Sequence, residues 1–140
     1  MFEYPVELKK DTNGTYQVSF PDIPEAHTFG DSPDEALGHA IEALEVALSF
    51  YIDEGEALPK PSAKRGRPIV RPSLIAEMKL GIYQSMRNAK IRKTDLARRM
   101  GVALMQIDRL LDLTHSSRVE QLEAAYGALG KRVHVELGVA

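Results

Sequence analysis

"KTDLARRMGVALMQIDRLL", residues 93–111, decides the fold of the C-terminal half of this chain. The stretch predicts two short helices around a turn of three to four residues, which is the pattern of a helix-turn-helix. The first helix needs a small residue where the second crosses it, and the turn needs a residue that tolerates a positive φ angle. Alanine and glycine stand at those two places, and apolar residues stand where the helices should touch. The six positions are Leu96, Ala97, Gly101, Val102, Ile107 and Leu110.

Further helices are expected on both sides of this stretch. Ser73 can cap a helix over residues 74–88, and another apolar pattern over 118–129 ends at a glycine. Their inward residues are predicted to be Leu74, Ile75, Met78, Ile82 and Met86, then Val119, Leu122, Ala125, Tyr126 and Leu129. The run from 74 to 129 resembles the helix-turn-helix of the Xre/Cro-like DNA-binding regulators, except that Arg92 stands where a capping threonine or serine is common. An ordinary helical hairpin with a glycine cap is the alternative interpretation.

The resemblance to these regulators implies a set of DNA-contacting residues. In their docking mode the start of the second motif helix enters the major groove. Gln106 could then bind adenine, and Arg109 could bind guanine or hold a phosphate. Asp108 is expected to point aside or to pair with Arg109 or Arg98, while His115 could equally be a loop residue without a role. The predicted DNA-binding residues are Lys93, Thr94, Leu104, Met105, Gln106, Arg109, His115 and Ser116.

Residues 132–139, RVHVELGV, alternate between polar and apolar side chains. Val133, Val135 and Leu137 would share one face of a terminal β-strand. A lone strand after a helical domain has unpaired edges, which the same strand of a second copy would satisfy. The sequence therefore predicts a homodimer through the C-terminal region, with two recognition helices about 34–36 Å apart on a pseudo-palindromic site.

The N-terminal part has the pattern of a small β-sheet. Residues 2–9 and 16–20 alternate as half-buried strands do, and Asn13-Gly14 between them is a strong hairpin signal. A short third strand is expected over 26–30.

One long helix should follow these strands, over about residues 33–54. Ser32 is a good N-cap, Glu35 completes a capping box, and Gly55 is the expected end. The stripe predicted to face the sheet is Leu37, Ile41, Leu44, Leu48 and Ile52. The order β-β-β-α predicts a small α+β unit, followed by an all-α domain.

Residues 58–73, LPKPSAKRGRPIVRPS, hold four prolines and five bases but no acid. This composition predicts a boundary, so the expected division is a domain over 1–58, a linker over 59–72 and a second domain over 73–140. The linker could be a solvated tether or a basic arm that touches phosphate. Residues 56–62 could also add a short edge strand to the first domain.

Charge divides along the chain in the same way. Residues 1–59 carry thirteen acids and two bases, a net charge of −11, whereas residues 60–140 carry sixteen bases and seven acids, a net charge of +9. A basic half suits a polyanion such as nucleic acid, and an acidic half suits a basic protein. The pattern predicts two surfaces for two partners, although chance segregation of solvated charge would look the same.

A longer motif joins the two halves. The run "GTYQVSFPDIPEAHTFGDSPDEAL", residues 14–37, followed by "LPKPS" and the helix-turn-helix, resembles the HicB antitoxins of bacterial type II toxin–antitoxin systems. The resemblance spans nearly the whole chain. It implies a degenerate ribonuclease H-like βββα(β) module that sequesters a HicA toxin, a small basic protein that cleaves mRNA. It also implies a C-terminal module that represses the chain's own operon.

The same resemblance implies where a toxin would bind. The acids in the loop and at the helix start are the expected contacts, namely Asp22, Glu25, Asp31 and Asp34. A larger hetero-oligomer of antitoxin dimers and toxin is a further expectation.

An enzyme fits this sequence less well. Ribonuclease H-like nucleases hold two metal ions with carboxylates, one of them inside the first strand. Here Glu3 and Glu7 alternate with the apolar residues and so face away from them. The chain has no cysteine, and its four histidines lack metal-ligand spacing. We therefore expect no catalytic residue, no metal and no cofactor.

Two further expectations concern setting and alternatives. No apolar run approaches the roughly 18 residues of a membrane span, and the N-terminus has no secretory pattern, which predicts a cytoplasmic protein without a membrane partner. A one-component helix-turn-helix regulator, whose N-terminal domain binds a small ligand, remains the alternative function.

Overall fold

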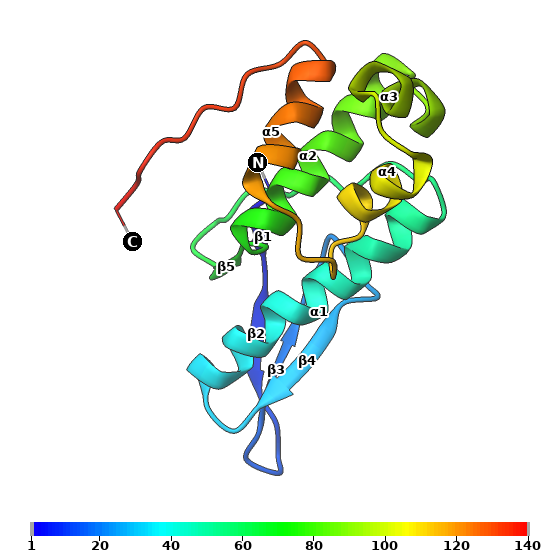
Figure 1. Ribbon diagram of the computed structural model, residues 1–140. Coiled ribbons are helices and arrows are strands. Elements are labelled where there is room, and N and C mark those ends of the chain that lie inside the picture. Colours follow the sequence, from blue (N-terminus) through cyan, green and yellow to red (C-terminus); the bar gives the residue numbers. More distant parts are fainter. Residues whose placement is uncertain (1, 140) are drawn as a thin grey trace. The chain divides into compact units, whose positions relative to one another are not determined.

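The computed structural model describes residues 2–139, which divide into two compact units, one up to residue 77 and one from residue 78 onward. The first unit combines a three-stranded antiparallel sheet with one long helix, and the second consists of helices (Figure 1). This mixed architecture, with strands first and helices after them, agrees with the α+β prediction.

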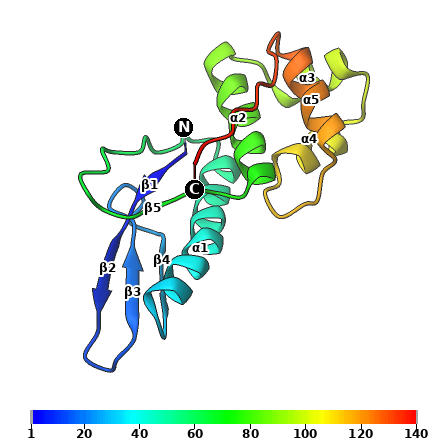
Figure 2. The ribbon, with the colours of Figure 1, turned by 90° about the vertical axis from the view of Figure 1, so that its left-hand side faces the viewer.

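The first unit is built around a short sheet. Its elements are β1 (Tyr4–Pro5), β2 (Glu7–Lys10), β3 (Tyr16–Ser19), β4 (His27–Gly30), α1 (Pro33–Asp53) and β5 (Ile69–Val70). Strands β2, β3 and β4 pair in that order, with Leu8 opposite Val18 and Gln17 opposite Phe29. Helix α1 lies along one face of this sheet (Figure 2).

The first predicted strand differs from the observed one. Instead of running unbroken over 2–9, the chain changes partner after Pro5, so that β1 pairs with β5 and β2 pairs with β3. Between them the amide of Val6 donates to the carbonyl of Pro68 (2.9 Å). Proline has no N–H to donate to a ladder, and a break beside it is the expected consequence.

Helix α1 begins as the sequence predicts, but it presents a different face to the sheet. The Ser32 hydroxyl accepts a hydrogen bond from the amide of Glu35 (3.1 Å), and Gly55 follows the helix with φ 69°. Its buried residues are Ala36, Ala40, Leu44, Ala47 and Leu48. Ile41, which we expected inside, is 40% exposed. Small alanines permit a close approach to β4, which turns the larger isoleucine outward.

Residues 59–72, predicted to be a linker, instead belong to the first unit. The Tyr4 hydroxyl donates to the carbonyl of Pro59 (2.7 Å), and the amide and hydroxyl of Ser62 donate to the Asp22 carboxylate (2.9 and 3.0 Å). The short strand β5 lies within the same segment. Although its prolines have no N–H, such a segment can be held against the domain when its carbonyls accept hydrogen bonds and its remaining amides donate them. The strand expected over 56–62 does not form.

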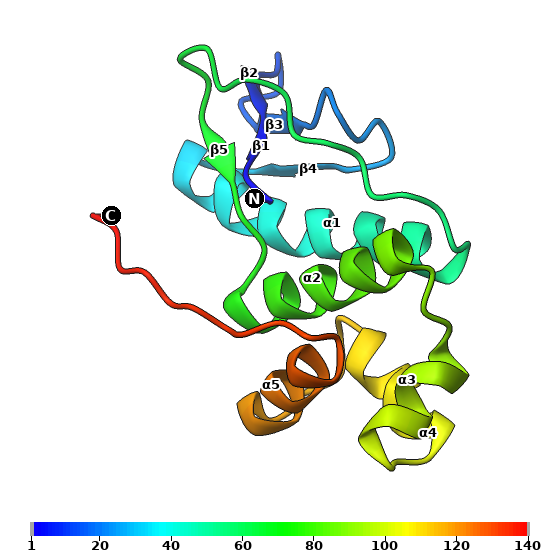
Figure 3. The same ribbon diagram turned by 90° about the horizontal axis from the view of Figure 1, so that it is seen from above.

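The second unit has a helical core. Its helices are α2 (Leu74–Ala89, which begins in the first unit), α3 (Lys93–Met100), α4 (Leu104–Leu111) and α5 (Val119–Ala128). Seen from above, α3, α4 and α5 lie on the same side of α2, and α3 contacts both α4 and α5 (Figure 3). Fully buried side chains include Leu80, Ile82, Leu96, Ile107 and Leu122. Leu74 and Val119, both predicted to face inward, are 65% and 51% exposed because each opens its helix at a solvated end.

The predicted terminal strand is not formed in the single chain. Residues 131–139 contain no helix or strand, and they run on from α5 as an extended segment (Figure 1). Leu137 is 93% exposed and Val135 is 69% exposed. A strand needs a partner for its backbone groups, and no segment among residues 2–139 supplies one. The dimer that would supply it stays a prediction.

Neither a membrane span nor a metal cluster is found in residues 2–139. Within this part of the chain no helix combines the length and the apolar character needed to cross a bilayer. In the same residues no three histidine, aspartate or glutamate side chains gather as a metal site would require.

Candidate nucleic-acid interface

Helices α3 and α4 meet around a three-residue turn. Gly101 ends α3 in the left-handed conformation (φ 68°, ψ 35°), which a glycine adopts without strain. The amide of Val102 donates back to the carbonyl of Ala97 (3.1 Å) and closes the turn. Leu96 and Ile107 are fully buried, so the residues expected to join the two helices do lie between them.

The start of α3 is capped by a residue that sequence reasoning did not single out. The Asp95 carboxylate accepts hydrogen bonds from the amide and the Nε of Arg92 (3.0 and 3.1 Å). These bonds hold the pKa of Asp95 at about 2. Arg98 lies 3.6 Å from the same carboxylate. Asp95 therefore satisfies the first amide of the helix, where Arg92 replaces the common capping threonine or serine, and it contacts both neighbouring arginines.

The outward face of α4 carries the predicted base-contacting residues. Leu104 and Met105 are 45% and 62% exposed, and Gln106 and Arg109 are also exposed. The Arg109 Nη2 lies 3.5 Å from the sulfur of Met105, one turn away. These four side chains share one accessible surface at the beginning and middle of the helix.

Asp108 pairs with a different cation from those we predicted. Its carboxylate is 2.9 Å from the Nζ of Lys93 at the start of α3, not beside Arg109 or Arg98. Both side chains are about half exposed, so the pair adds little stability. It neutralises the one acid on the outward side of α4 with the side chain of Lys93.

The loop after α4 is folded on itself. The Asp112 carboxylate accepts hydrogen bonds from the amide and hydroxyl of Thr114 (2.9 and 2.7 Å), which lower its pKa. The amide of His115 donates to the carbonyl of Asp112 (3.1 Å). His115 and Ser116 are exposed, whereas Ser117 is buried. The two predicted contact residues thus lie on an ordered turn.

A buried lysine holds this region together. Lys79 of α2 is fully buried, and its Nζ donates to the carbonyls of Arg109, Asp112 and His115 (2.8, 2.7 and 2.7 Å). Burial lowers the pKa of Lys79, and the nearby Asp112 carboxylate opposes that shift. The ammonium group is a shared donor to three carbonyls at the end of α4 and in the following turn, two of which, those of Arg109 and Asp112, also accept a backbone amide. One signal in the sequence indicates this role: Lys79 stands four residues after Ile75 and three before Ile82, on an otherwise apolar stripe.

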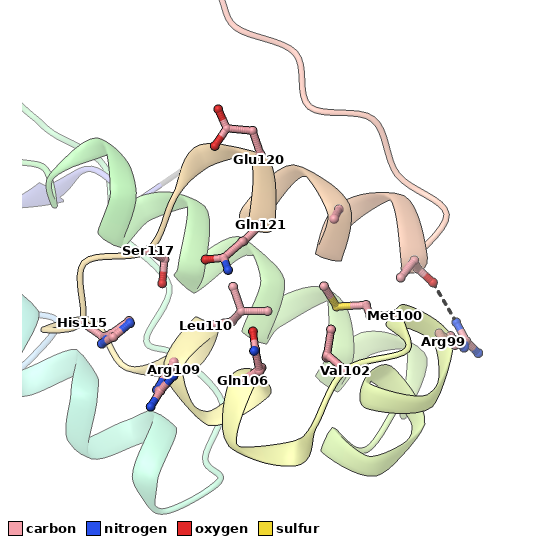
Figure 4. Close-up of a pocket in the computed structure, with 12 residues that line it drawn as sticks. Arg99, Met100, Val102, Gln106, Arg109, Leu110, His115, Ser117, Glu120 and Gln121 are labelled. Atoms are coloured by element: carbon pink, nitrogen blue, oxygen red, sulfur yellow. Dashed lines mark hydrogen bonds between the residues drawn. The ribbon is translucent and has the colours of Figure 1, made fainter.

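A hollow of about 560 Å³ lies beside α4, between α3, the 115–117 turn and α5. Figure 4 shows its lining, in which Gln106 and Leu110 from α4 face Gln121 from α5. At one end the Arg99 guanidinium donates to the carbonyl of Ala128 (3.2 Å). Arg109 and His115 lie at the other end. Three of the predicted DNA-binding residues, Gln106, Arg109 and His115, therefore line one hollow.

The charge division is smaller when the observed units are used. Five bases of the expected linker lie in the first unit, which therefore carries a net charge of −7 up to residue 77. The second unit holds eleven bases and six acids from residue 78 onward, a net charge of +5. The signs stay opposite, so a polyanion is still attracted to the helical unit.

The four acids predicted to bind a toxin do not form one cluster of equivalent groups. Asp22 accepts from Ser62, as described above. Glu25 accepts from the Tyr51 hydroxyl (2.7 Å), which raises the pKa of Tyr51 to about 12. Asp31 and Asp34 are exposed at the start of α1. Two of the four acids therefore have structural partners, and two lie at an accessible helix start.

The fold and charge define an acidic strand-and-helix unit joined to a basic helical one. A family model described as the HicB_like antitoxin of bacterial toxin–antitoxin systems matches residues 3–81. Antitoxin HicB of Pseudomonas fluorescens is 36% identical over an alignment of 142 positions that covers 100% of this chain and 97% of that protein. The chain belongs to the HicB-like antitoxin family, and the family resemblance seen in the sequence is confirmed.

A second relative gives the same result. Antitoxin HicB of Escherichia coli K12 is 35% identical over 131 positions, which cover 93% of this chain and 95% of that protein. A solved structure of the Burkholderia pseudomallei antitoxin HicB is 27% identical, covers 54% of this chain and 67% of that chain, and has a TM-score of 0.46. A family of antitoxins is regulatory rather than catalytic.

Proposed function

We propose that this protein is an antitoxin that neutralises a small basic toxin of the HicA type and represses its own operon. In this proposal the first unit binds the toxin, which cleaves mRNA when free. The second unit binds operator DNA through a helix-turn-helix formed by α3 and α4. The observation that carries the proposal is full-length similarity to antitoxin HicB in a chain whose α4 presents exposed polar and cationic residues.

The DNA-binding role draws its support from the second unit. An exposed face on α4, an ordered turn with His115 and Ser116, and a net charge of +5 are what a recognition helix and its phosphate contacts require. The paired Lys93 could release Asp108 and bind phosphate, and Thr94 lies beside it on α3. Neither role needs a cofactor or a catalytic residue.

Assembly and setting complete the proposal. We propose a homodimer through residues 131–139, whose exposed alternating side chains would pair with those of a second copy, and a larger complex with toxin. The first unit would be a reduced ribonuclease H-like fold that lacks nuclease activity. Because bacterial operator DNA lies in the cytoplasm, the protein would act there.

The first experiment is co-expression with the small basic protein encoded beside it. We expect a stable complex on size exclusion, loss of toxicity, and a shift of the operon's promoter fragment by the full-length protein. A protein that shifts no promoter fragment and binds no such neighbour would contradict both proposed activities. A small-ligand sensor would instead show thermal stabilisation by a metabolite.

Replacing Arg109 with alanine should weaken operator binding by about 1–3 kcal/mol, because the guanidinium of a recognition helix contacts base or phosphate. Titration of a labelled promoter fragment measures the effect. Toxin binding should not change. Arg87→Ala, an arginine on α2 outside α3, α4 and the following turn, is the matched control and should cost within about 0.5 kcal/mol. Equal losses for both variants would show that only total charge matters.

Replacing Asp31 and Asp34 together with lysine should slow toxin association, most of all at low salt, because long-range attraction is screened as ionic strength rises. Stopped-flow mixing at two salt concentrations measures the rate. The control is Asp53→Lys with Glu54→Lys at the other end of α1, which changes net charge equally. If both pairs slow association alike, the helix start has no special part in the encounter.

A further inference from the structure

A groove of about 360 Å³ lies between the edge strand β4 and helix α1. Thr28 lines it from the strand side, and Val46 and Phe50 line it from α1. Val46 is 47% exposed and Phe50 is 60% exposed, and the two lie one helical turn apart. Two large apolar side chains side by side in a groove are a feature of binding surfaces, in contrast to single exposed residues.

The strand beside this groove has an open edge. In the sheet order β2-β3-β4, β4 pairs with β3 on one side, and no strand among residues 2–139 pairs with its other side. One group on the strand is already engaged, since the His39 Nδ1 lies 2.9 Å from the carbonyl of Phe29. Open sheet edges can accept an extended segment from another protein, which adds hydrogen bonds from backbone to backbone.

Two carboxylates line the groove, together with the imidazoles of His27 and His39. Glu25 and Glu42 both line it, and Glu25 is held in place by its hydrogen bond from Tyr51. The whole unit carries a net charge of −7. A second copy of this unit would bring like charges together, whereas a cationic partner would be attracted.

We propose that this groove is the docking site for the small basic toxin. An extended segment of that protein pairs with the free edge of β4, sets an apolar side chain against Val46 and Phe50, and places lysine or arginine beside Glu25 and Glu42. The inference rests on the proposed antitoxin function and places the main toxin contact in the groove between β4 and α1. Of the acids predicted from the sequence, Glu25 lines the groove, whereas Asp22 serves the fold through Ser62. The groove adds exposed apolar side chains and an open strand edge to that carboxylate.

The test uses the full-length chain and, as probe, the small basic protein encoded by the neighbouring reading frame. The variant Val46→Ser with Phe50→Ser removes the exposed apolar side chains of the groove, and we expect its dissociation constant to rise by about tenfold or more. Ile41→Ser with Leu74→Ser is the matched control, because these apolar residues are 40% and 65% exposed and do not line the groove. The control should bind within about threefold of the parent.

Two further measurements separate the parts of the proposal. Glu42→Lys should weaken binding more at low salt than at high salt, and Glu54→Lys, an equal charge change outside the groove, should do so less. Hydrogen exchange should slow at the amides of residues 27–29 when the toxin binds, because a paired edge strand is protected.

The outcomes are distinguishable. If the parent binds the toxin and the groove variants bind equally well, the groove is not the site although the proposed function stands. If the parent itself binds no such protein, the proposed function fails. If the groove variants instead reduce the mass of the free protein's assembly and leave toxin binding intact, the groove holds a second copy, which overturns the proposal.

Discussion

Lys79→Met should lower the free energy of unfolding by about 3 kcal/mol, because it leaves three backbone carbonyls without the donor that they share. Methionine keeps most of the volume and the apolar stem of lysine, so lost packing contributes little. The carbonyls of Arg109, Asp112 and His115 mark the end of α4 and the turn after it, and one buried ammonium group satisfies all three. Water would have to enter the core to replace it.

Thermal unfolding of the full-length protein, followed by circular dichroism, measures this effect. For a domain of 60–100 residues each kcal/mol shifts the midpoint by about 4–8 °C, so a loss of about 3 kcal/mol should lower it by about 12–24 °C. Lys93→Met is the control, because that lysine is 53% exposed and forms a surface pair worth at most about 1 kcal/mol. A midpoint within about 3 °C of the parent for Lys79→Met would show that the three carbonyls do not depend on the ammonium group.

The fold elements that sequence predicted well are those specified by local signals. The cap from Ser32 to Glu35, the glycine at 101 and the end of α1 at Gly55 all act within a few residues, and each is found in place. The errors arise where the partner is distant in the chain. Strand β1 pairs with β5, and neither Pro5 nor Ile69 shows this in its own sequence context.

In the candidate sites, too, features set by one element were predicted and contacts between distant residues were not. Alternation and helical spacing placed Leu104, Met105 and Arg109 on an exposed face, since those depend on one helix alone. Spacing did not reveal that Asp108 pairs with Lys93, because that contact crosses from α4 to α3. Nor did it reveal that Asp22 binds Ser62, forty residues away. A charge count along the chain names candidate acids, but it cannot separate acids that hold the fold from acids that face a partner.

Substitution by alanine at two glycines of the first unit should change the stability of the protein in opposite directions. A Cβ at Gly30, at the end of β4, would lie 2.5 Å from the amide nitrogen of Ala36 and 2.8 Å from its Cα. Those are backbone atoms of the first turn of α1, and the same nitrogen donates to the carbonyl of Ser32 (2.9 Å). Because helix and strand must move apart, Gly30→Ala should cost about 2–3 kcal/mol.

Gly38, in the exposed part of α1, is the matched substitution. No atom lies within 4 Å of a Cβ built there, and glycine costs a helix interior about 1 kcal/mol relative to alanine. Gly38→Ala should therefore stabilise the protein by about that amount, and urea denaturation of the two variants compares them directly. If both variants destabilise the protein, the open space beside Gly38 is not the whole reason for a glycine at that position. If both are neutral, β4 and α1 can separate at little cost, and the close approach through Gly30 does not hold the sheet against the helix.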